Sequence, residues 1–375
     1  MYKLNIDGGI IGEPEDLGVT RKGLENVMDV LKDQTKEGLH SGVQLHITRQ
    51  GETVLEIAIG EARPRVPLKT NSVLLIYSST KPITAIAIAN LWEKGKIHLN
   101  QTVKSIIPEF SGGKEACTIR HIMTHVAGFP MHAYSFKGTN SNENFLSDIY
   151  NHKLEFTPGT QCSYHPSSSW MILGEIVRRI DGRPLRKYLK EEVFNPLGMN
   201  ETSLGLSEER IKELGDRWAR KDSNVPEDES SIRWDNVVNA PTKVFLPGGS
   251  GYSTATDMGT FYKALWNGGE WNGNRIVKKR TLDYFTATNL TGIIDQTFGL
   301  FTSKGFGFHK GKSVGLRCSP KAFGHGGKRS CINFCDPELD LIVNFNSRTL
   351  LNNDDHYKRS QEMIDVIYEA CRFNF

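Results

Sequence analysis

The sequence has no hydrophobic run long enough to cross a membrane, few cysteines and little net charge. Its longest nearly continuous apolar stretch, residues 83–92, is about half the length of a membrane-spanning helix. The first seven residues lack the hydrophobic core of a signal peptide, so we expect a cytoplasmic protein with no membrane partner. A formal net charge of +3 at pH 7 does not favour a nucleic-acid partner either.

Two patterns that often bind metals are incomplete. Cys331 and Cys335 have no Cys-x-x-Cys pair to match, and the six cysteines of this long chain are too few for a disulfide scaffold. His121 and His125 lie four apart on an expected helix, but Ile122 replaces the glutamate of a His-Glu-x-x-His zinc motif. We therefore expect buried free thiols, no metal and no other cofactor.

Hydrophobic residues form 38% of the 375 residues and charged residues 24%, which is typical of a globular chain with a sizeable core. Strand patterns lie toward both ends of the chain, and helix patterns lie between them. The predicted elements are a β-hairpin at 42–60 around Gly51, helices at 78–93, 118–126, 170–181, 185–194, 257–267 and 355–370, and strands at 306–308, 330–336 and 339–346.

The economical arrangement of these elements is an α/β (α+β) fold. The two ends of the chain would form one antiparallel sheet flanked by helices, and a mainly helical lobe would be inserted between them. We place the sheet lobe at residues 20–76 and 285–375 and the helical lobe at residues 77–284.

The segment with the clearest chemical meaning is Ser78-Ser79-Thr80-Lys81, at the start of an apolar helix. Residues three apart share a helix face, so the Ser78 hydroxyl and the Lys81 amine can meet. A serine is a weak nucleophile until a base removes its proton, and a lysine in a low-dielectric site can be that base. Pro82 is tolerated in the first helical turn if Ser78, rather than Ser79, begins the motif. Alone, the pattern is weak, because it occurs by chance in many chains and is more typical of an N-cap serine beside a solvated lysine.

Further segments follow the Ser-Lys pair in an order that is more specific than any one of them. They lie at 118–130, 158–164, 173–177, 196–199, 248–257 and 323–327. In order and spacing, the series resembles the serine β-lactamase and penicillin-binding-protein superfamily, above all the class C-like group with the family VIII carboxylesterases. The resemblance covers roughly residues 25–370, and it implies one β-lactamase/transpeptidase-like catalytic domain.

The resemblance implies a role for three side chains and two backbone groups. Ser78 would be the acylated nucleophile and Lys81 its partner base. Tyr164 matches the tyrosine of the family's Tyr-x-Asn motif, which helps to activate the nucleophile and protonates the leaving group. The backbone N–H groups of Ser78 and Lys328 would form the oxyanion hole, and fixed donors of this kind are usually a large catalytic factor.

The third motif of the family favours an uncharged substrate. His325, Gly326 and Gly327 stand where β-lactamases have Lys-Thr-Gly and esterases often have His-Gly-Gly, and we expect them to bind substrate. The family's lysine is charged and helps to hold a substrate carboxylate, whereas a histidine is mostly neutral at neutral pH. A structural role for His325 in its strand is the alternative.

The second motif departs from the β-lactamase pattern as well. His165, which we also expect to contact substrate, follows Tyr164, but Pro166 replaces the asparagine of the motif. In β-lactamases this asparagine contacts substrate amides, so its loss argues against β-lactam or peptide chemistry. Ser167 or Ser168 is a candidate for the missing polar contact.

The predicted function is that of a serine hydrolase with an acyl-serine intermediate, most simply a carboxylesterase acting on small or medium uncharged esters. An acyltransferase, an amidase or peptidase, or a weak β-lactamase would use the same Ser-Lys-Tyr site. A catalytically idle binding relative is disfavoured, because all three residues are present. Residues 248–251 lack the Gly-Lys-[Ser/Thr] ending of a phosphate loop, and the chain has no Gly-x-Ser-x-Gly elbow. The expected partner is a small-molecule ester or amide.

Overall fold

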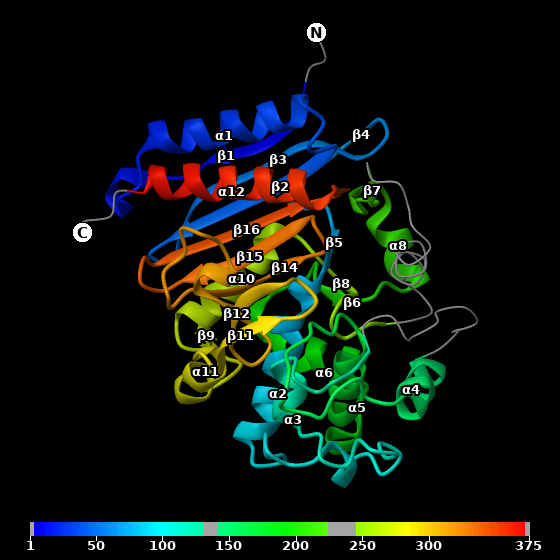
Figure 1. The fold of residues 1–375 in the computed structure, drawn as a ribbon. Helices are drawn as coiled ribbons and strands as arrows, with labels where there is room; N and C mark the ends of the chain where they lie inside the picture. Colours follow the sequence, from blue (N-terminus) through cyan, green and yellow to red (C-terminus); the bar gives the residue numbers. More distant parts are fainter. Residues whose placement is uncertain (1–3, 131–141, 224–244, 372–375) are drawn as a thin grey trace.

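The computed structural model describes residues 4–130, 142–223 and 245–371, and its largest element is an antiparallel sheet of ten strands (Figure 1). The strands run in the order β1, β3, β2, β16, β15, β14, β13, β12 and β11, and β4 pairs with β3. Because β2 pairs with β16, both ends of the chain form one sheet, which confirms the predicted fold class. The bounds are β1 Ile6–Ile10, β2 Gly42–Arg49, β3 Glu52–Arg63, β4 Val66–Pro67, β11 Leu290–Asp295, β12 Leu300–Lys304, β13 His309–Lys310, β14 Phe323–Gly327, β15 Cys331–Asp336 and β16 Leu341–Ser347.

The predicted hairpin at 42–60 is confirmed, with β2 and β3 paired over the whole of β2. Its turn consists of Gln50 and Gly51, whose φ angles are 51° and 83°. A two-residue turn with positive φ at both positions matches the right-handed twist of the flanking strands.

Helices cover both faces of the sheet. On one face, α1 (Arg21–Lys36) packs beside α12 (Asn353–Ala370), as Figure 1 shows. On the other face, α10 (Ala255–Trp266) contacts β2, β15 and β16. Helix α1 was not among the predicted elements, although its buried apolar side chains have helical spacing: Leu24, Val27 and Leu31.

The segments between the two parts of the sheet are mainly helical. They are α2 Lys81–Glu93, α3 Ile119–Met123, α4 Asn142–Asn151, α5 Ser168–Asp181, α6 Leu185–Leu189, a π-helical turn Lys190–Phe194, α7 Asn195–Leu197, α8 Glu208–Leu214 and α11 Lys279–Thr286. Short 3₁₀ turns lie at Pro14–Leu17, Ser78–Thr80, Val103–Ser105, Gly215–Arg217 and Gly311–Ser313. Helix α2 is buried from Lys81 to Leu91, as its apolar sequence predicts.

Three small sheets complete the described structure. Strand β8 (Gly251–Ser253) lies between β5 (Leu74–Tyr77) and β6 (Ser203–Leu204). The other two sheets pair β9 with β10 and β7 with β17, whose bounds are Glu270–Trp271, Asn274–Arg275, Asp222–Ser223 and Thr349–Leu350. The division into lobes at residues 77 and 284 stays a proposal.

Two local predictions are wrong. Residues 306–308 form a bend rather than a strand, since Gly307 has a φ of 81° and packs against Ala85 of α2. His121 and His125 do not share a helix, because α3 ends at Met123 and His125 has a φ of 62°.

The expected buried free thiols are confirmed, since all six cysteines are unpaired and buried. Among the helices of the described ranges, none has the length and apolar character that a bilayer span requires.

Candidate active site

Ser78 lies at a sharp turn between strand β5 and helix α2. The preceding residue, Tyr77, has φ 46° and ψ −130°, a conformation that favours glycine. Holding a bulky residue there costs about 1–3 kcal/mol, so the surrounding packing must impose it. The turn places the Ser78 side chain at the point where α2 meets the end of β14, which contacts the 3₁₀ turn Ser78–Thr80.

Lys81 is completely buried and has three polar neighbours. Its Nζ lies 3.0 Å from Ser78 Oγ, 2.9 Å from the Pro166 carbonyl oxygen and 2.8 Å from the Gly248 carbonyl oxygen. Burial, together with the nearby charge of Lys304, holds the pKa of Lys81 well below its usual range. A neutral amine has two N–H donors, which the two carbonyls accept, so its lone pair is left facing the Ser78 hydroxyl.

Tyr164 approaches Ser78 from the other side. Its phenol donates to Ser78 Oγ at 2.8 Å, and its ring packs at 4.7 Å from the ring of His125. Burial raises the pKa of Tyr164 above its usual value, so the phenol keeps its proton. Ser78 Oγ therefore accepts a hydrogen bond from Tyr164 and is free to donate its own proton to Lys81.

A buried ion pair supports the Tyr164 segment. Asp295 Oδ1 accepts from the Tyr164 N–H at 3.1 Å, and Asp295 Oδ2 lies 3.0 Å from Lys304 Nζ. The Gln296 N–H also donates to the Cys162 carbonyl at 2.8 Å. Burial alone would raise the pKa of Asp295, but the charge and hydrogen bond of Lys304, together with the backbone N–H donors of Thr297 and Tyr164, lower it overall. The turn between β11 and β12 thus holds the backbone of Tyr164.

Strand β14 forms the opposite wall of the site. The His325 ring lies 6.0 Å from the Tyr164 ring, and the backbone carbonyl of His325 accepts from Ser79 Oγ at 2.8 Å. A side chain at Gly327 would come within 2.4 Å of the Ile76 carbonyl oxygen, so glycine allows β14 to lie against the end of β5.

Lys328 follows β14 directly and has a φ of 30°. Its Nζ lies 6.0 Å from the centre of the Tyr77 ring, so Lys328 is beside the turn that carries Ser78.

His325 is neutral in this environment. Burial and the adjacent His309 ring, 4.2 Å away, hold its pKa well below the usual value. Its Nδ1 lies 2.6 Å from the Gly326 carbonyl, which can only accept, so Nδ1 carries the proton. The remaining ring nitrogen, Nε2, carries a lone pair and has no hydrogen-bond partner among the described residues.

His165 lies deeper in the protein than the other predicted site residues. Its ring is completely buried, packs edge-on against Phe129 at 5.5 Å and lies 5.7 Å from the His125 ring. The backbone N–H of His165 donates to His125 Nδ1 at 3.0 Å, and burial lowers the pKa of the His165 ring to about 3. The adjacent Pro166 contributes its carbonyl to Lys81, so this position of the second motif contacts the site through the backbone.

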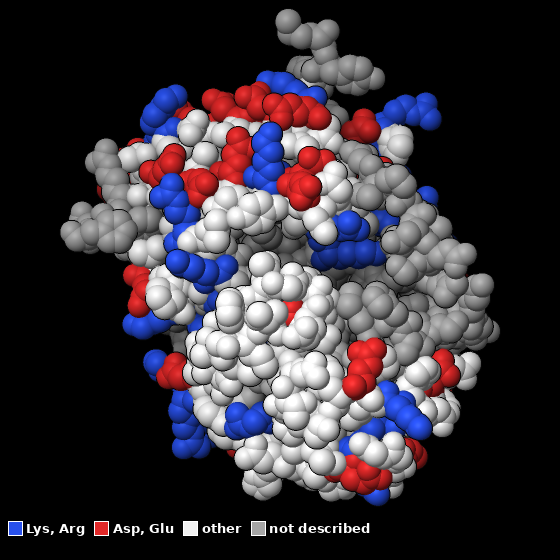
Figure 2. All heavy atoms as spheres, viewed as in Figure 1, with Lys and Arg blue, Asp and Glu red and all other residues white. Residues whose placement is uncertain are grey.

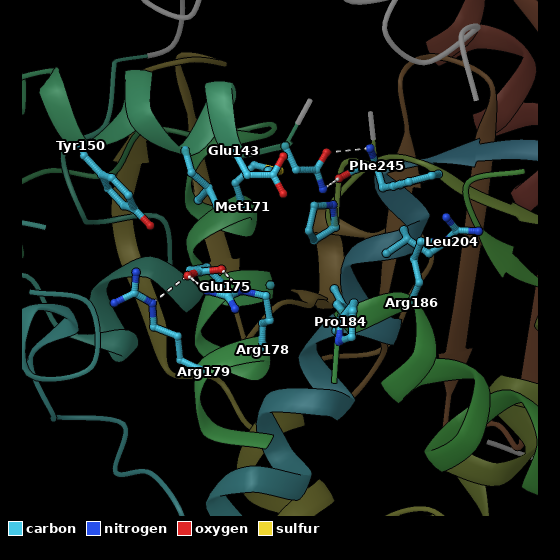
Figure 3. A pocket seen from close by; sticks show the side chains of 15 residues that line it. Glu143, Tyr150, Met171, Glu175, Arg178, Arg179, Pro184, Arg186, Leu204 and Phe245 are labelled. Atoms are coloured by element: carbon cyan, nitrogen blue, oxygen red, sulfur yellow. Dashed lines mark hydrogen bonds and ion pairs between the residues drawn. The ribbon is translucent and has the colours of Figure 1, made fainter. Parts of the chain in front are cut away.

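A cavity of about 600 Å³ opens elsewhere, between α4, α5 and α6 (Figure 3). Its wall includes Pro247, the neighbour of Gly248, and the ion pair in which Glu175 Oε1 lies 2.6 Å from Arg179 Nε. Neither Ser78 nor Tyr164 lines it, so the nucleophile lies outside this cavity. In the described ranges, no three His, Cys, Asp or Glu side chains are grouped to hold a metal ion.

Several contributors to the site were not predicted as such. The Pro166 and Gly248 carbonyls act through the backbone, which leaves no side-chain signal, although 248–257 belongs to the motif series. Asp295 and Lys304 are far from the motifs, and a charged pair flanking a turn is usually a surface feature. Their burial was the missing information.

Comparisons with known proteins agree with this geometry. A family model described as Beta-lactamase matches residues 27–367. A Salmonella enteritidis PT4 protein named as a D-alanyl-D-alanine carboxypeptidase is 25% identical over 381 residues, covering 92% of this chain and 86% of that protein.

Two solved structures share the fold at 24% identity. A family VIII carboxylesterase has a TM-score of 0.80, and a penicillin-binding-protein homologue from Caulobacter crescentus has a TM-score of 0.78; each covers 94% of this chain and 99% of the other. The resemblance predicted from the motifs is confirmed: the chain belongs to the β-lactamase family and is a serine hydrolase of the β-lactamase and penicillin-binding-protein superfamily.

Proposed function

We propose that this protein is a carboxylesterase that acts on small or medium uncharged esters through an acyl-Ser78 intermediate. The observation that carries the proposal is the position of Ser78 Oγ, 3.0 Å from Lys81 Nζ and 2.8 Å from the Tyr164 phenol. The lowered pKa of Lys81 and the raised pKa of Tyr164 favour a neutral amine as the base and a neutral phenol as the acid.

The reaction follows from these roles. Lys81 takes the Ser78 proton while Oγ forms a bond to the ester carbonyl carbon, and the backbone N–H groups of Ser78 and Lys328 stabilise the oxyanion. The bond to the alcohol oxygen then breaks, Tyr164 protonates that oxygen, and Lys81 returns its proton to Tyr164. Water then bonds to the acyl carbonyl carbon and gives a proton to Lys81, the bond to Ser78 Oγ breaks, Oγ regains that proton, and the acid is released.

An ester is favoured over a charged or amide substrate by two residues. His325 is neutral where a lysine would hold a carboxylate, and its unpaired Nε2 is an acceptor that disfavours an anion. Pro166 offers no side-chain amide to position an amide substrate. Acyl transfer, in which an alcohol replaces water, would use the same site.

Peptidase activity is the second candidate, because the Salmonella relative is named as a D-alanyl-D-alanine carboxypeptidase. Such a substrate ends in a carboxylate, which the surroundings of His325 do not favour. We expect turnover of p-nitrophenyl butyrate to exceed turnover of a D-alanyl-D-alanine peptide and of a chromogenic cephalosporin, and the reverse order would favour the second candidate.

The nucleophile is tested by covalent labelling. A fluorophosphonate should add one adduct to the intact mass, on the peptide that contains Ser78, and Ser78→Ala should abolish both the adduct and esterase turnover, by at least about 10⁴-fold. Ser79→Ala is the matched control and should keep the adduct, since Ser79 Oγ donates to the His325 carbonyl instead. An adduct on Ser79 or Ser250 in the wild type would contradict the assignment.

A further inference from the structure

The hairpin formed by β11 and β12 exposes an unusual concentration of large apolar side chains. Among the described residues, four of the exposed large hydrophobic side chains fall within positions 294–301. They are Ile294, Phe298, Leu300 and Phe301, with exposed fractions of 41%, 54%, 68% and 73%. Groups of this kind on a soluble surface usually mark a binding site.

The exposed part of the hairpin carries no charge. The only ionisable residues between positions 290 and 304 are Asp295 and Lys304, which are buried and paired with each other. In Figure 2 the surface over β11 and β12 is correspondingly almost free of charged residues. The surface therefore suits an apolar, uncharged group.

The strand register places three of the four side chains, Ile294, Leu300 and Phe301, on two faces. Asp295 is directly opposite Leu300, and Ile294 is directly opposite Phe301, so each pair shares a face and the two pairs point to opposite faces. Asp295 accepts from the Tyr164 N–H, which identifies its face as the one toward the site. Leu300 is therefore on the inner face, and Ile294 and Phe301 are on the outer face.

Phe298, in the turn, also lies on the side of the site. Its ring centre is 5.3 Å from that of Tyr164, whose phenol donates a hydrogen bond to Ser78 Oγ. A group that leaves Ser78 along the Tyr164 ring would thus reach Phe298, and Leu300 lies two positions further along the chain on the inner face of β12.

We infer that Phe298 and Leu300 form a subsite for the alcohol portion of the ester, and that the preferred substrates carry an apolar alcohol. The inference rests on the proposed function, in which Tyr164 protonates the leaving alcohol oxygen. That oxygen must lie at the Tyr164 phenol, so the alcohol chain extends across the ring toward Phe298. The acyl group lies on the other side of the carbonyl carbon, away from this hairpin.

The experiment varies the alcohol while the acyl group stays constant. Straight-chain acetates from methyl to hexyl acetate all form the same acetyl-enzyme, so differences in kcat/KM report only the steps that involve the alcohol. Each methylene that is fully buried should change kcat/KM by about fourfold, and each methylene that enters a half-open subsite should change it by about twofold. We expect kcat/KM, measured by acid release in a pH-stat, to rise about 30-fold across the series.

Two double variants separate the faces. In the double variant Phe298→Ser, Leu300→Ser, the rise of kcat/KM from methyl to hexyl acetate should be less than about threefold. Ile294→Ser with Phe301→Ser removes comparable apolar area from the outer face and should leave the rise unchanged. All four side chains are exposed, so the substitutions should cost little stability, and fluorophosphonate labelling of Ser78 verifies that each variant is folded.

The outcomes distinguish this inference from the proposed function. If the wild type is labelled at Ser78 and hydrolyses acetates without a dependence on alcohol length, the subsite is wrong and the esterase proposal stands. If both double variants reduce the rise of kcat/KM with alcohol length equally, the subsite is wrong and the hairpin acts as a general contact surface. If ethyl esters of lengthening acids show the dependence that Phe298→Ser with Leu300→Ser removes, the hairpin binds the acyl group instead. Absence of both labelling and acetate turnover would contradict the proposed function itself.

Discussion

The interior of the site and its rim are built in different ways. Around Ser78, the serine hydroxyl, the Lys81 amine and the Tyr164 phenol have defined partners at 2.8–3.0 Å, and all three groups are buried. At the rim, Phe298 contacts the Tyr164 ring and is more than half exposed. Buried polar groups stabilise one arrangement because an unpaired group is costly there, whereas an apolar rim acts through area and tolerates change.

The difference separates chemistry from selectivity. Substitutions in the interior should reduce turnover by orders of magnitude, and substitutions at the walls and rim should change which substrate is preferred by smaller factors. A small effect of Lys81→Met or Tyr164→Phe on turnover would remove that division.

The largest effect is expected from Lys81→Met, which keeps the length of the side chain and removes the base. We expect kcat for p-nitrophenyl butyrate to fall by about 10³–10⁴-fold with a much smaller change in KM, because the amine acts in the transition state. Lys114→Met is the matched control: Lys114 is also buried, but its Nζ donates to the His152 carbonyl at 2.8 Å, away from Ser78. Near-normal kcat in Lys81→Met would exclude lysine as the base.

Tyr164→Phe should have the next largest effect. The variant keeps the ring contacts and removes only the proton that is given to the alcohol, so kcat should fall by about 10²–10³-fold for alkyl esters. The loss should be smaller for p-nitrophenyl esters, whose leaving group needs no proton. Tyr262→Phe, at a buried phenol with no hydrogen-bond partner among the described residues, should leave kcat unchanged. Equal losses for both kinds of ester would contradict the acid role.

Lys304→Met should move the pH profile rather than abolish activity. Burial and the Lys304 charge both lower the pKa of Lys81, so removing that charge raises the pKa and leaves more Lys81 protonated at a given pH. Activity requires the neutral amine, so the acidic limb of kcat/KM should move to higher pH. At a fixed pH on that limb, kcat/KM should therefore fall, by up to about tenfold.

The control for this prediction is Lys310→Met. Burial also lowers the pKa of Lys310, to about 8, but its Nζ donates to the Lys321 carbonyl. An acidic limb that moves equally in both variants, or in neither, would show that Lys304 does not act on Lys81. Asp295→Asn combined with Lys304→Met avoids an unpaired buried carboxylate and should also move the acidic limb to higher pH.

The role of Lys304 also bears on what the sequence could predict. One antiparallel sheet formed by both ends of the chain, the buried helix α2 and the Ser78-Lys81-Tyr164 set could be predicted, because they depend on local periodicity and on motifs with fixed spacing. Helix α1 and strands β11 and β12 were not predicted. The bend at Gly307 was missed because alternating aromatic residues around a glycine resemble a strand, and only packing against Ala85 shows otherwise.

The supporting parts of the site depend on contacts between distant segments. Asp295 supports Tyr164 across 131 positions, and the Gly248 carbonyl reaches Lys81 across 167. Neither contact leaves a local pattern in the sequence. The same holds for the β11–β12 hairpin, because assigning its side chains to one face or the other requires the strand register, which the composition does not give.

The smallest effect is expected at the opposite wall. His325 is buried, neutral and donates from Nδ1 to the Gly326 carbonyl, so it offers substrate no positive charge. In His325→Lys a cation would stand near Ser78, where a substrate carboxylate could pair with it. A charge-assisted hydrogen bond is roughly twice as strong as a neutral one, so recognition of carboxylate-bearing substrates should improve about three- to tenfold relative to neutral esters.

Total activity in His325→Lys should fall, because the new charge lies close to Lys81 and Lys304 and displaces the His309 contact. The measurement is therefore the ratio of kcat/KM for a chromogenic cephalosporin to that for p-nitrophenyl acetate, in the wild type and in the variant, with His309→Gln as a control that alters the neighbouring ring without adding charge. A wild-type ratio well above one would contradict the ester preference. If this ratio is unchanged in His325→Lys, or rises equally in His309→Gln, charge at position 325 does not determine selectivity. Of the two regions proposed to select substrates, only the β11–β12 hairpin would then remain.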